Sequence, residues 1–189
     1  LQDGTVMIWR PMKVIKNYIT KEELNTIKQT LENPNFPWYY NYPITPNTYK
    51  LASNRLKFKN QENKKLYLKD FQFTHTFYKN YNITSNAYFN MLNPILRKLD
   101  TEALIRIKAN LRPYMEKTHQ TGWHIDNETP GAKTAIFYVN TNNGYTLFKN
   151  KKIIKAEENK IVVFDSKLQH CGVSSTDTKY RMVINFNYV

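Results

Sequence analysis

The sequence predicts a mainly β protein, a cupin-like jelly-roll barrel with supporting helices ahead of it. From Ala103 onward, short runs with strand-like alternation are separated by turn residues, which is typical of antiparallel strands. Before that point, two segments combine a helix-start signal with the apolar spacing of a helix. The chain of 189 residues fits one domain, which we divide into helical support and lid segments (1–102) and the barrel core (103–189).

The first helix should begin after Thr20. Thr20 and Glu23 have the spacing of a capping box, in which each side chain binds the backbone N–H of the other residue. The helix should run to about residue 32, and its apolar face is formed by Leu24, Ile27 and Leu31. Ahead of it, the apolar residues at 6–9 and 14–15 predict a peripheral strand.

An aromatic, proline-bounded segment follows this helix. Residues 38–42 contain one tryptophan and three tyrosines between Pro37 and Pro43. Such a loop could cover the entrance of a site or pack on the barrel exterior, and the sequence leaves both readings open. The basic run within residues 54–70 is expected to be a solvated surface, because no nucleic-acid-binding motif accompanies it.

A strand and a second helix complete the first half. Residues 71–78 alternate like a strand with its phenylalanines on one side. His75 shares that side, so we expect a packed core histidine rather than a metal ligand. Residues 84–99 predict a helix capped by a hydroxyl residue at its start, which Pro94 should kink or split.

The second half is almost all strand. Asn142-Asn143-Gly144 should form a tight hairpin turn, because Asn-Gly favours left-handed backbone conformations. A lysine-rich turn at residues 149–152 should reverse the chain again. The expected strands are 104–111, 134–140, 145–148, a strand beginning at 153–154, 161–165, 170–173 and 180–189. Many short antiparallel strands in so few residues predict the jelly-roll barrel.

Composition limits the class of protein. A single cysteine, Cys171, excludes an internal disulfide framework and is expected to be a small packed residue. The N-terminus has no signal-like apolar region and no run reaches the length that spans a bilayer, so we expect no membrane contact and a soluble, cytoplasmic protein. A formal net charge of +13 attracts polyanions, so nucleic-acid contact stays open beside a solvated basic surface.

The motif with most chemical meaning is Gly122-Trp123-His124-Ile125-Asp126. In an extended strand, His124 and Asp126 project to the same side. His170 follows a later apolar strand and supplies a third candidate ligand. Two imidazoles and one carboxylate on one face of iron(II) leave the opposite positions open for a cosubstrate and oxygen. The arrangement predicts an oxygenase.

An H-x-D pattern alone is weak evidence for a metal site, because it occurs by chance in many chains. The order of the residues that follow it strengthens the prediction. The pattern opens a series of hairpins, His170 follows a later strand, and Arg181 lies in the next one. Arg181 offers a planar, permanently charged fork suited to a carboxylate. The plainer alternatives are a surface pair for His124 and Asp126, an isolated turn residue for His170, and an ion pair of Arg181 with an acidic side chain such as Asp165. His119 is expected to be exposed.

The C-terminal half resembles the iron(II)- and 2-oxoglutarate-dependent dioxygenases, and its pattern is most similar to their prolyl 4-hydroxylase-like group. The H-x-D…H triad of that family falls on His124, Asp126 and His170, and its basic residue falls on Arg181. The resemblance implies a double-stranded β-helix fold and iron(II) bound by the triad. It also implies that Arg181 binds the distal carboxylate of 2-oxoglutarate.

Two further segments carry the resemblance. Residues 134–140 and 144–148 resemble the family's tyrosine-bearing strand and its Gly-Gly-x-Thr-x-Phe segment. This match implies that the Tyr138 hydroxyl joins Arg181 at the same carboxylate and that Thr146 lines the pocket. Tyr145 stands where a second glycine is often found, so the pocket wall is expected to differ there.

One more cosubstrate contact is implied less directly. Asn110 and the segment Arg112-Pro113-Tyr114 lie where the family usually supplies an additional polar group. By that match, Asn110 and Tyr114 are candidate cosubstrate ligands. The first hundred residues match the family only as a helical support ahead of the barrel.

The function implied by the resemblance is hydroxylation of a C–H bond with oxygen and 2-oxoglutarate, releasing succinate and carbon dioxide. Its prolyl-hydroxylase-like pattern favours a protein or peptide side chain as the substrate. Two alternatives stay open: oxidation or demethylation of a nucleobase in DNA or RNA, and a non-catalytic basic β-barrel that binds a partner. A zinc hydrolase is disfavoured because the sequence has no H-E-x-x-H helix and no placed general base.

Overall fold

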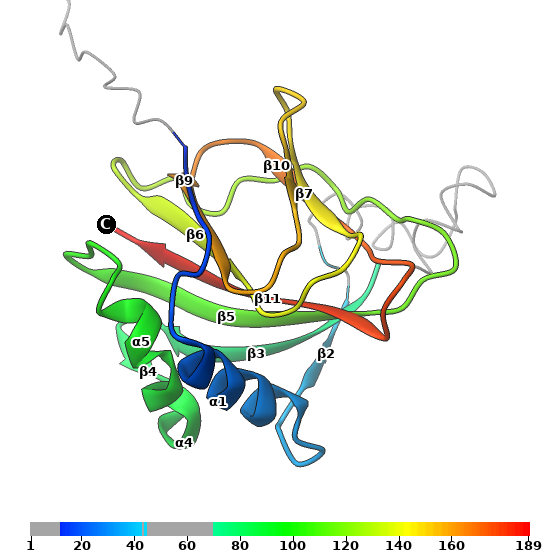
Figure 1. Cartoon of the computed structure of the whole chain (residues 1–189). Helices are drawn as coiled ribbons and strands as arrows, with labels where there is room; N and C mark the ends of the chain where they lie inside the picture. Colours follow the sequence, from blue (N-terminus) through cyan, green and yellow to red (C-terminus); the bar gives the residue numbers. More distant parts are fainter. Residues whose placement is uncertain (1–11, 43, 45–69) are drawn as a thin grey trace, which may run out of the picture.

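Two antiparallel sheets face each other, and helices cover the outer side of the larger one (Figure 1). This computed structural model describes residues 12–42, 44 and 70–189. The strand predicted at residues 6–9 and the basic run at 54–69 lie outside the described residues. The architecture confirms the prediction of a mainly β fold with supporting helices.

The main sheet has eight strands, all paired antiparallel. Strands from both sides of residue 102 share it, so the N-terminal part of the chain supplies strands as well as helices. In order across the sheet they are β1 (Lys13–Ile15), β9 (Lys160–Asp165), β6 (Lys133–Tyr138), β11 (Tyr180–Tyr188), β5 (Leu104–Pro113), β3 (Gln72–Lys79) and β2 (Tyr39–Asn41), with β4 (Asn82–Ile83) also paired to β3.

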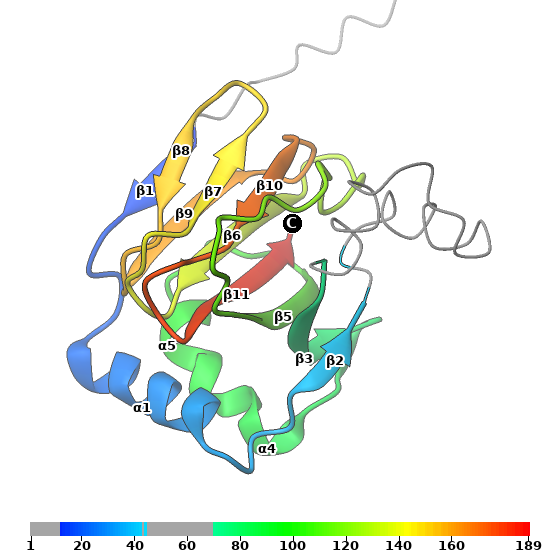
Figure 2. The same ribbon diagram turned by 90° about the vertical axis from the view of Figure 1, so that its right-hand side faces the viewer.

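The small sheet has three strands and an irregular edge. β7 (Tyr145–Phe148) lies between β10 (His170–Val173) and β8 (Ile153–Lys155). Single bridges join Gln120 to Val173 and His124 to His170, so the segment that contains the H-x-D pattern runs along β10. Figure 2 shows this small sheet stacked over β6, β11 and β5.

The connection from β6 to β7 corrects one prediction. The Asn-Asn-Gly turn was expected to close a hairpin, but β7 pairs with β8 and β10 and not with β6. The chain instead crosses there from the main sheet to the small sheet. Gly144 has no left-handed backbone, since Gly131 is the one glycine with positive φ in the part that the structure describes. The predicted reversal at residues 149–152 does join the hairpin of β7 and β8.

Helix α1 (Lys21–Glu32) forms as predicted. The Thr20 hydroxyl accepts the Glu23 N–H at 3.2 Å, and the Glu23 carboxylate accepts the Thr20 N–H at 2.9 Å, which completes the capping box. Its apolar face is buried in the main core through Leu24, Ile27 and Leu31.

The second helical region is split, as Pro94 predicts. It consists of α4 (Asn86–Phe89), a 3₁₀ turn η1 (Asn90–Leu92) and α5 (Asn93–Leu96), with Pro94 in the first turn of α5. The expected hydroxyl cap is missing, because Ser85 makes no capping bond. Its hydroxyl lies 2.7 Å from Nε2 of His75 instead. His75 is buried among aromatic rings, which confirms it as a core residue.

Alternation along β5 and β11 separates a core from a cavity. Ile107 and Ala109 on β5, with Met182 and Ile184 on β11, lie in the hydrophobic core shared with the helices. The intervening residues face the space between the two sheets and are largely polar. The main sheet therefore packs on the helices with one face, and its other face meets the small sheet through a second apolar cluster and the polar cavity.

The aromatic segment after α1 forms the short edge strand β2 rather than a loop. Tyr39 and Tyr40 are exposed, and Tyr40 contacts the rings of Phe71 and Phe73. Trp38 packs against the main core and donates its indole N–H to the Leu31 carbonyl at 3.0 Å. The segment thus packs on the outside of the sheet. No helix in the described ranges is long and apolar enough to cross a membrane.

The capping box gives a stability prediction. Replacing Thr20→Ala should lower the free energy of unfolding by about 1 kcal/mol, because the Glu23 N–H loses its acceptor. Urea denaturation measures the change. The control is Thr26→Ala in the exposed middle of the same helix, expected within about 0.5 kcal/mol of the parent. An equal loss in both variants would contradict the capping explanation.

Candidate metal centre and adjoining pocket

Two histidines are placed side by side by their own backbones. The His124 N–H donates to the His170 carbonyl and the His170 N–H donates to the His124 carbonyl, each at 3.0 Å. This reciprocal pair joins the H-x-D segment to the first residue of β10. The ring centroids lie 4.6 Å apart. The two imidazoles therefore converge although 45 residues separate them in the chain.

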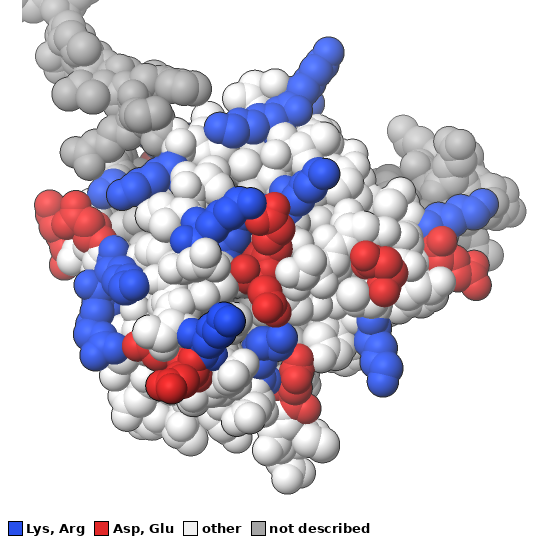
Figure 3. All heavy atoms as spheres, viewed as in Figure 1, with Lys and Arg blue, Asp and Glu red and all other residues white. Residues whose placement is uncertain are grey.

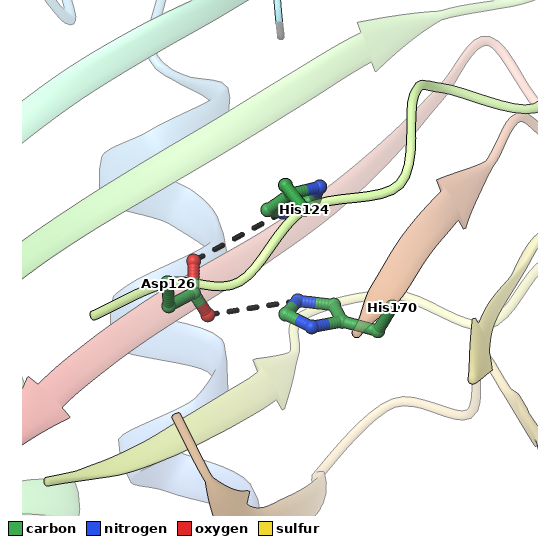
Figure 4. A group of neighbouring side chains, drawn as sticks. All are labelled: His124, Asp126 and His170. Atoms are coloured by element: carbon green, nitrogen blue, oxygen red, sulfur yellow. Dashed lines mark ion pairs between the residues drawn. The ribbon is translucent and has the colours of Figure 1, made fainter. Parts of the chain in front are cut away.

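The Asp126 carboxylate faces both rings from one side (Figure 4). Its carboxylate oxygens are 4.0 Å from Nε2 of His124 and 3.5 Å from Nε2 of His170. One ligand atom from each of the three residues lies within 4.8 Å of the others. The Asp126 side chain is only 4% exposed, and its Oδ2 atom has no hydrogen-bond donor among the described residues. A buried carboxylate oxygen without a donor fits a metal ligand.

Both imidazoles are prepared to bind a metal through Nε2. Nδ1 of His124 lies 3.1 Å from the Gly122 carbonyl, and Nδ1 of His170 lies 2.9 Å from the Leu168 carbonyl. A carbonyl can only accept a hydrogen bond, so each Nδ1 is the donor, and the neutral form of each ring then has its lone pair on Nε2. Burial, opposed by the Asp126 carboxylate, lowers the pKa of His170. The two rings and Asp126 thus have the composition of an iron(II) site with open positions.

A buried polar group adjoins this centre. The Tyr138 hydroxyl donates to Oγ1 of Thr146 at 2.8 Å, and Nη2 of Arg181 donates to the same atom at 3.3 Å. Since Thr146 accepts both bonds, its own hydroxyl proton remains available to a ligand. Nε of Arg181 is buried without a partner among the described residues. These donors suit a carboxylate.

The same group has a marked electrostatic character. Arg181 is fully enclosed, and burial lowers its pKa, although an arginine remains charged. Burial also raises the pKa of Tyr138, so its hydroxyl stays protonated. The guanidinium lies 5.7 Å from the centre of the Tyr138 ring. Arg181 does not pair with Asp165, whose carboxylate accepts the Lys167 N–H on the surface, so that alternative is wrong.

A cavity of about 210 Å³ connects the two groups. Its wall contains the three candidate metal ligands together with Arg181, Thr146 and Asn110. The structure therefore gathers almost all of the sequence-predicted site residues around one space. Tyr138 lies behind this wall, in contact with Thr146.

Solved structures match this arrangement of strands. The 2OG-Fe(II) oxygenase family oxidoreductase from Burkholderia pseudomallei matches with a TM-score of 0.58 at 11% identity, over 94% of this chain and 83% of that one. The non-haem alpha-ketoglutarate-dependent epimerase SnoN from nogalamycin biosynthesis matches with a TM-score of 0.59 at 9% identity, over 94% and 76%. This chain has the fold of the 2OG-Fe(II) oxygenases. Neither a known family model nor a curated protein sequence matches it.

A third oxygenase-fold structure is more distant. The viral collagen prolyl hydroxylase from Paramecium Bursaria Chlorella virus-1 gives a TM-score of 0.47 at 13% identity, over 100% of this chain and 98% of that one. A likeness of this size does not place the chain in the prolyl hydroxylase group. The double-stranded β-helix fold is confirmed, and the narrower group stays a prediction.

Of the two candidates for an additional cosubstrate contact, Asn110 lies at the cavity and Tyr114 does not. Asn110 lines the cavity, and its Oδ1 atom is buried with no donor among the described residues. Tyr114 is 51% exposed and is not part of the cavity wall. Strand β5 ends at Pro113, so its alternation no longer directs the next side chain inward. The structure therefore does not bring Tyr114 to the site.

Sequence reasoning missed three basic residues of the oxygenase-fold cavity. Arg106, Lys108 and Arg112 line it from β5, and their alternate spacing with Asn110 was the signal that could have found them. Burial and, second, the charge of Arg106 lower the pKa of Lys108 to about 8, while Asp126 acts in the opposite direction. The cavity is thus more basic than the predicted residues alone imply.

Two further predictions concern His119 and Cys171: the first is wrong and the second is confirmed. His119 was expected to be exposed but is buried, with its N–H donated to Ser174 at 2.8 Å and its imidazole 3.9 Å from Asp70. The reason is that the segment before His124 joins the edge of the small sheet. Cys171 is buried as a packed residue, and burial raises the pKa of its thiol to about 11.

A glycine is needed at position 144 because the backbone there passes close to Arg181 and Val173, and not because the turn needs a left-handed conformation. Its N–H donates to the Asn142 side chain at 2.9 Å. A Cβ atom at this position would lie 2.8 Å from Cδ of Arg181 and 2.8 Å from the carbonyl oxygen of Val173. Such contacts are too short for a real side chain. The absence of a side chain thus lets the crossing segment pass directly over Arg181.

This close approach predicts opposite behaviour for two glycines. Gly144→Ala should lower the free energy of unfolding by about 1–3 kcal/mol, because Arg181 or the Val173 backbone must move. Gly172→Ala should stay within about 1 kcal/mol of the parent, since its Cβ would meet atoms no closer than 3.9 Å. Denaturation in urea compares them, and equal losses would refute the steric account of Gly144.

Proposed function

We propose that this chain is an iron(II)- and 2-oxoglutarate-dependent oxygenase that hydroxylates a C–H bond. One observation carries the proposal. The buried Asp126 carboxylate faces the Nε2 atoms of two imidazoles whose Nδ1 atoms are held by backbone carbonyls, its Oδ2 atom has no donor among the described residues, and a buried arginine lines the same cavity. The fold of 2OG-Fe(II) oxygenases supports the assignment.

Each group has a distinct task in this proposal. His124, Asp126 and His170 would hold iron(II), and the backbone carbonyls behind the two imidazoles keep the rings oriented. Bound iron with oxygen and 2-oxoglutarate would supply the oxidation, in which R–H becomes R–OH as 2-oxoglutarate becomes succinate and carbon dioxide.

The second group of residues positions the cosubstrate. Arg181 would bind the distal carboxylate of 2-oxoglutarate with its charged fork. Thr146 would donate its free hydroxyl proton to that carboxylate, and the Tyr138 hydroxyl would support Thr146 or turn to the ligand. Asn110 would offer a further polar contact from β5. Burial of these groups excludes water and strengthens each bond.

A protein or peptide side chain remains our predicted substrate, and it rests on the prolyl-hydroxylase-like sequence pattern. The nucleobase alternative was motivated by the net positive charge and by the aromatic segment, on which a flipped base could stack. Tyr39 and Tyr40 instead lie on β2 and do not line the cavity. On the face shown in Figure 3, lysine and arginine are interspersed with acidic residues rather than gathered in one basic surface. Neither β2 nor this face of the molecule therefore supports the nucleobase alternative.

The metal assignment is tested by an anaerobic titration of the protein with iron(II) and 2-oxoglutarate. We expect a visible metal-to-ligand charge-transfer band, and His124→Ala should abolish it because one of the three ligands is lost. His75→Ala is the matched histidine control, which should unfold more easily but keep the band, since His75 is buried and does not line the cavity. No band in metal-loaded parent protein would overturn the proposed function and favour a binding module.

The cosubstrate assignment is tested separately with the same band. Arg181→Ala should raise the 2-oxoglutarate concentration needed for half-saturation by about ten- to hundredfold, as expected for the loss of hydrogen bonds to a charged group. Arg97→Ala removes an exposed arginine and should leave the titration unchanged. An unchanged titration of Arg181→Ala would show that another residue holds the distal carboxylate.

A further inference from the structure

Strand β5 forms a basic wall of the cavity. Four of its residues occupy alternate positions, so they share the face between the sheets and line the cavity: Arg106, Lys108, Asn110 and Arg112. Residues two apart in a strand are separated by about 7 Å, so this row extends for about 20 Å. It runs from the metal centre, where Arg106 is 3.5 Å from Asp126, to the strand position opposite Arg181.

The cavity has more positive charge than the proposed binding of 2-oxoglutarate requires. Among the described residues, Asp126 supplies the one carboxylate of the wall, and it is a proposed metal ligand that already pairs with Arg106. Arg181 is assigned to the cosubstrate. Lys108 and Arg112 are left without an acidic partner on the wall. A bound divalent metal would increase the positive charge further.

Arg112 is the more clearly unpaired of Lys108 and Arg112, because its buried nitrogens have no hydrogen-bond partner among the described residues. It is 3% exposed, and none of its three side-chain nitrogens has a hydrogen-bond partner in the part that the structure describes. Burying such a group costs free energy, and Arg181 directly across the strand pair adds repulsion. Burial and, second, the charge of Arg181 lower the pKa of Arg112 to about 10, while Asp70 acts in the opposite direction. An unpaired, buried fork of donors is suited to an anionic ligand.

The two arginines are direct neighbours, but their other contacts lie on different strands. Arg181 contacts Thr146 on β7 and the ring of Tyr138 on β6. Arg112 belongs to β5, whose other neighbour is β3, and Gln72 of β3 lines the cavity on that side. A cosubstrate carboxylate held by Arg181 and Thr146 therefore leaves the donors of Arg112 for a second group.

We propose that the molecule oxidised by this protein carries a negatively charged group, a carboxylate or a phosphate, that binds Arg112, with Lys108 as a second positive charge. The inference rests on the proposed function, because it takes Arg181 as the cosubstrate ligand. The planar fork of an arginine binds either anion with two parallel hydrogen bonds. A peptide substrate would supply such a group as an aspartate or glutamate side chain.

The test measures binding of small anions rather than turnover. The full chain is loaded under argon with manganese(II) and 2-oxoglutarate, with protein in excess of metal. Inorganic phosphate, acetate and acetamide are then titrated, and paramagnetic broadening of their NMR signals reports binding near the metal. We expect phosphate or acetate to bind at least about tenfold more tightly than uncharged acetamide, because only the anions form charge-assisted hydrogen bonds. The tighter of the two anions identifies the chemical group.

Substitutions on β5 test whether the anion binds at Arg112 and Lys108. Arg112→Gln should weaken anion binding about tenfold or more, and Arg112→Lys should restore part of it because the charge returns. Lys108→Met should weaken binding by a smaller factor. Lys21→Met removes an exposed charge of α1 that does not line the cavity, and it should have no effect. Each variant is checked for 2-oxoglutarate affinity, which should change less than threefold in Arg112→Gln.

Two results would overturn this inference while leaving the proposed function intact. One is equal, weak binding of all three probes by a protein that shows the iron and 2-oxoglutarate band. The other is an Arg112→Gln variant that keeps anion binding but loses 2-oxoglutarate affinity as severely as Arg181→Ala, which would make Arg112 a cosubstrate ligand. Absence of the band in the parent protein would instead refute the proposed function itself.

Discussion

Strand register in the middle of the main sheet is the constraint on which the site depends. β11 is hydrogen-bonded to β5 on one side and to β6 on the other, so its alternation is held from both edges. Arg181 faces the cavity and Met182 faces the helices. A shift of the strand register by one residue would exchange these faces. Arg181 would then be buried among apolar side chains, and Met182 would face the polar cavity. Apolar packing beneath the helices thus fixes where the polar groups point.

The site itself lies where the two sheets meet. His124 and His170 come from adjacent segments of the small sheet, whereas Arg181 comes from the main sheet. The crossing between the sheets brings Gly144 against Arg181, and the small sheet places Thr146 within hydrogen-bond distance of the same arginine. The candidate metal ligands and the Arg181 group therefore line one cavity, where Arg181, Thr146 and His170 lie on strands and His124 is fixed to His170 by two backbone hydrogen bonds.

Buried positive charge is the energetic cost of this arrangement. Arg112 and Arg181 are direct neighbours across a strand pair, both enclosed, and the described residues leave most of their nitrogens unpaired. Hydrophobic packing on the far side of the sheet offsets that cost in the free protein. If an anion binds Arg112 as proposed, it removes part of this cost, because it accepts hydrogen bonds from donors that are otherwise unsatisfied.

The sequence by itself determined the elements and the chemistry of the candidate ligands. Thr20, Pro94 and the alternation after Ala103 act through local hydrogen bonds, ring constraints and strand period, and these forces need no distant partner. The tertiary structure alone decided which strands pair. It turned the expected hairpin at Gly144 into a crossing between sheets, buried His119 beside Ser174, and left Tyr114 in solvent. These outcomes depend on contacts between residues far apart in the chain, where packing and close approach override local preference.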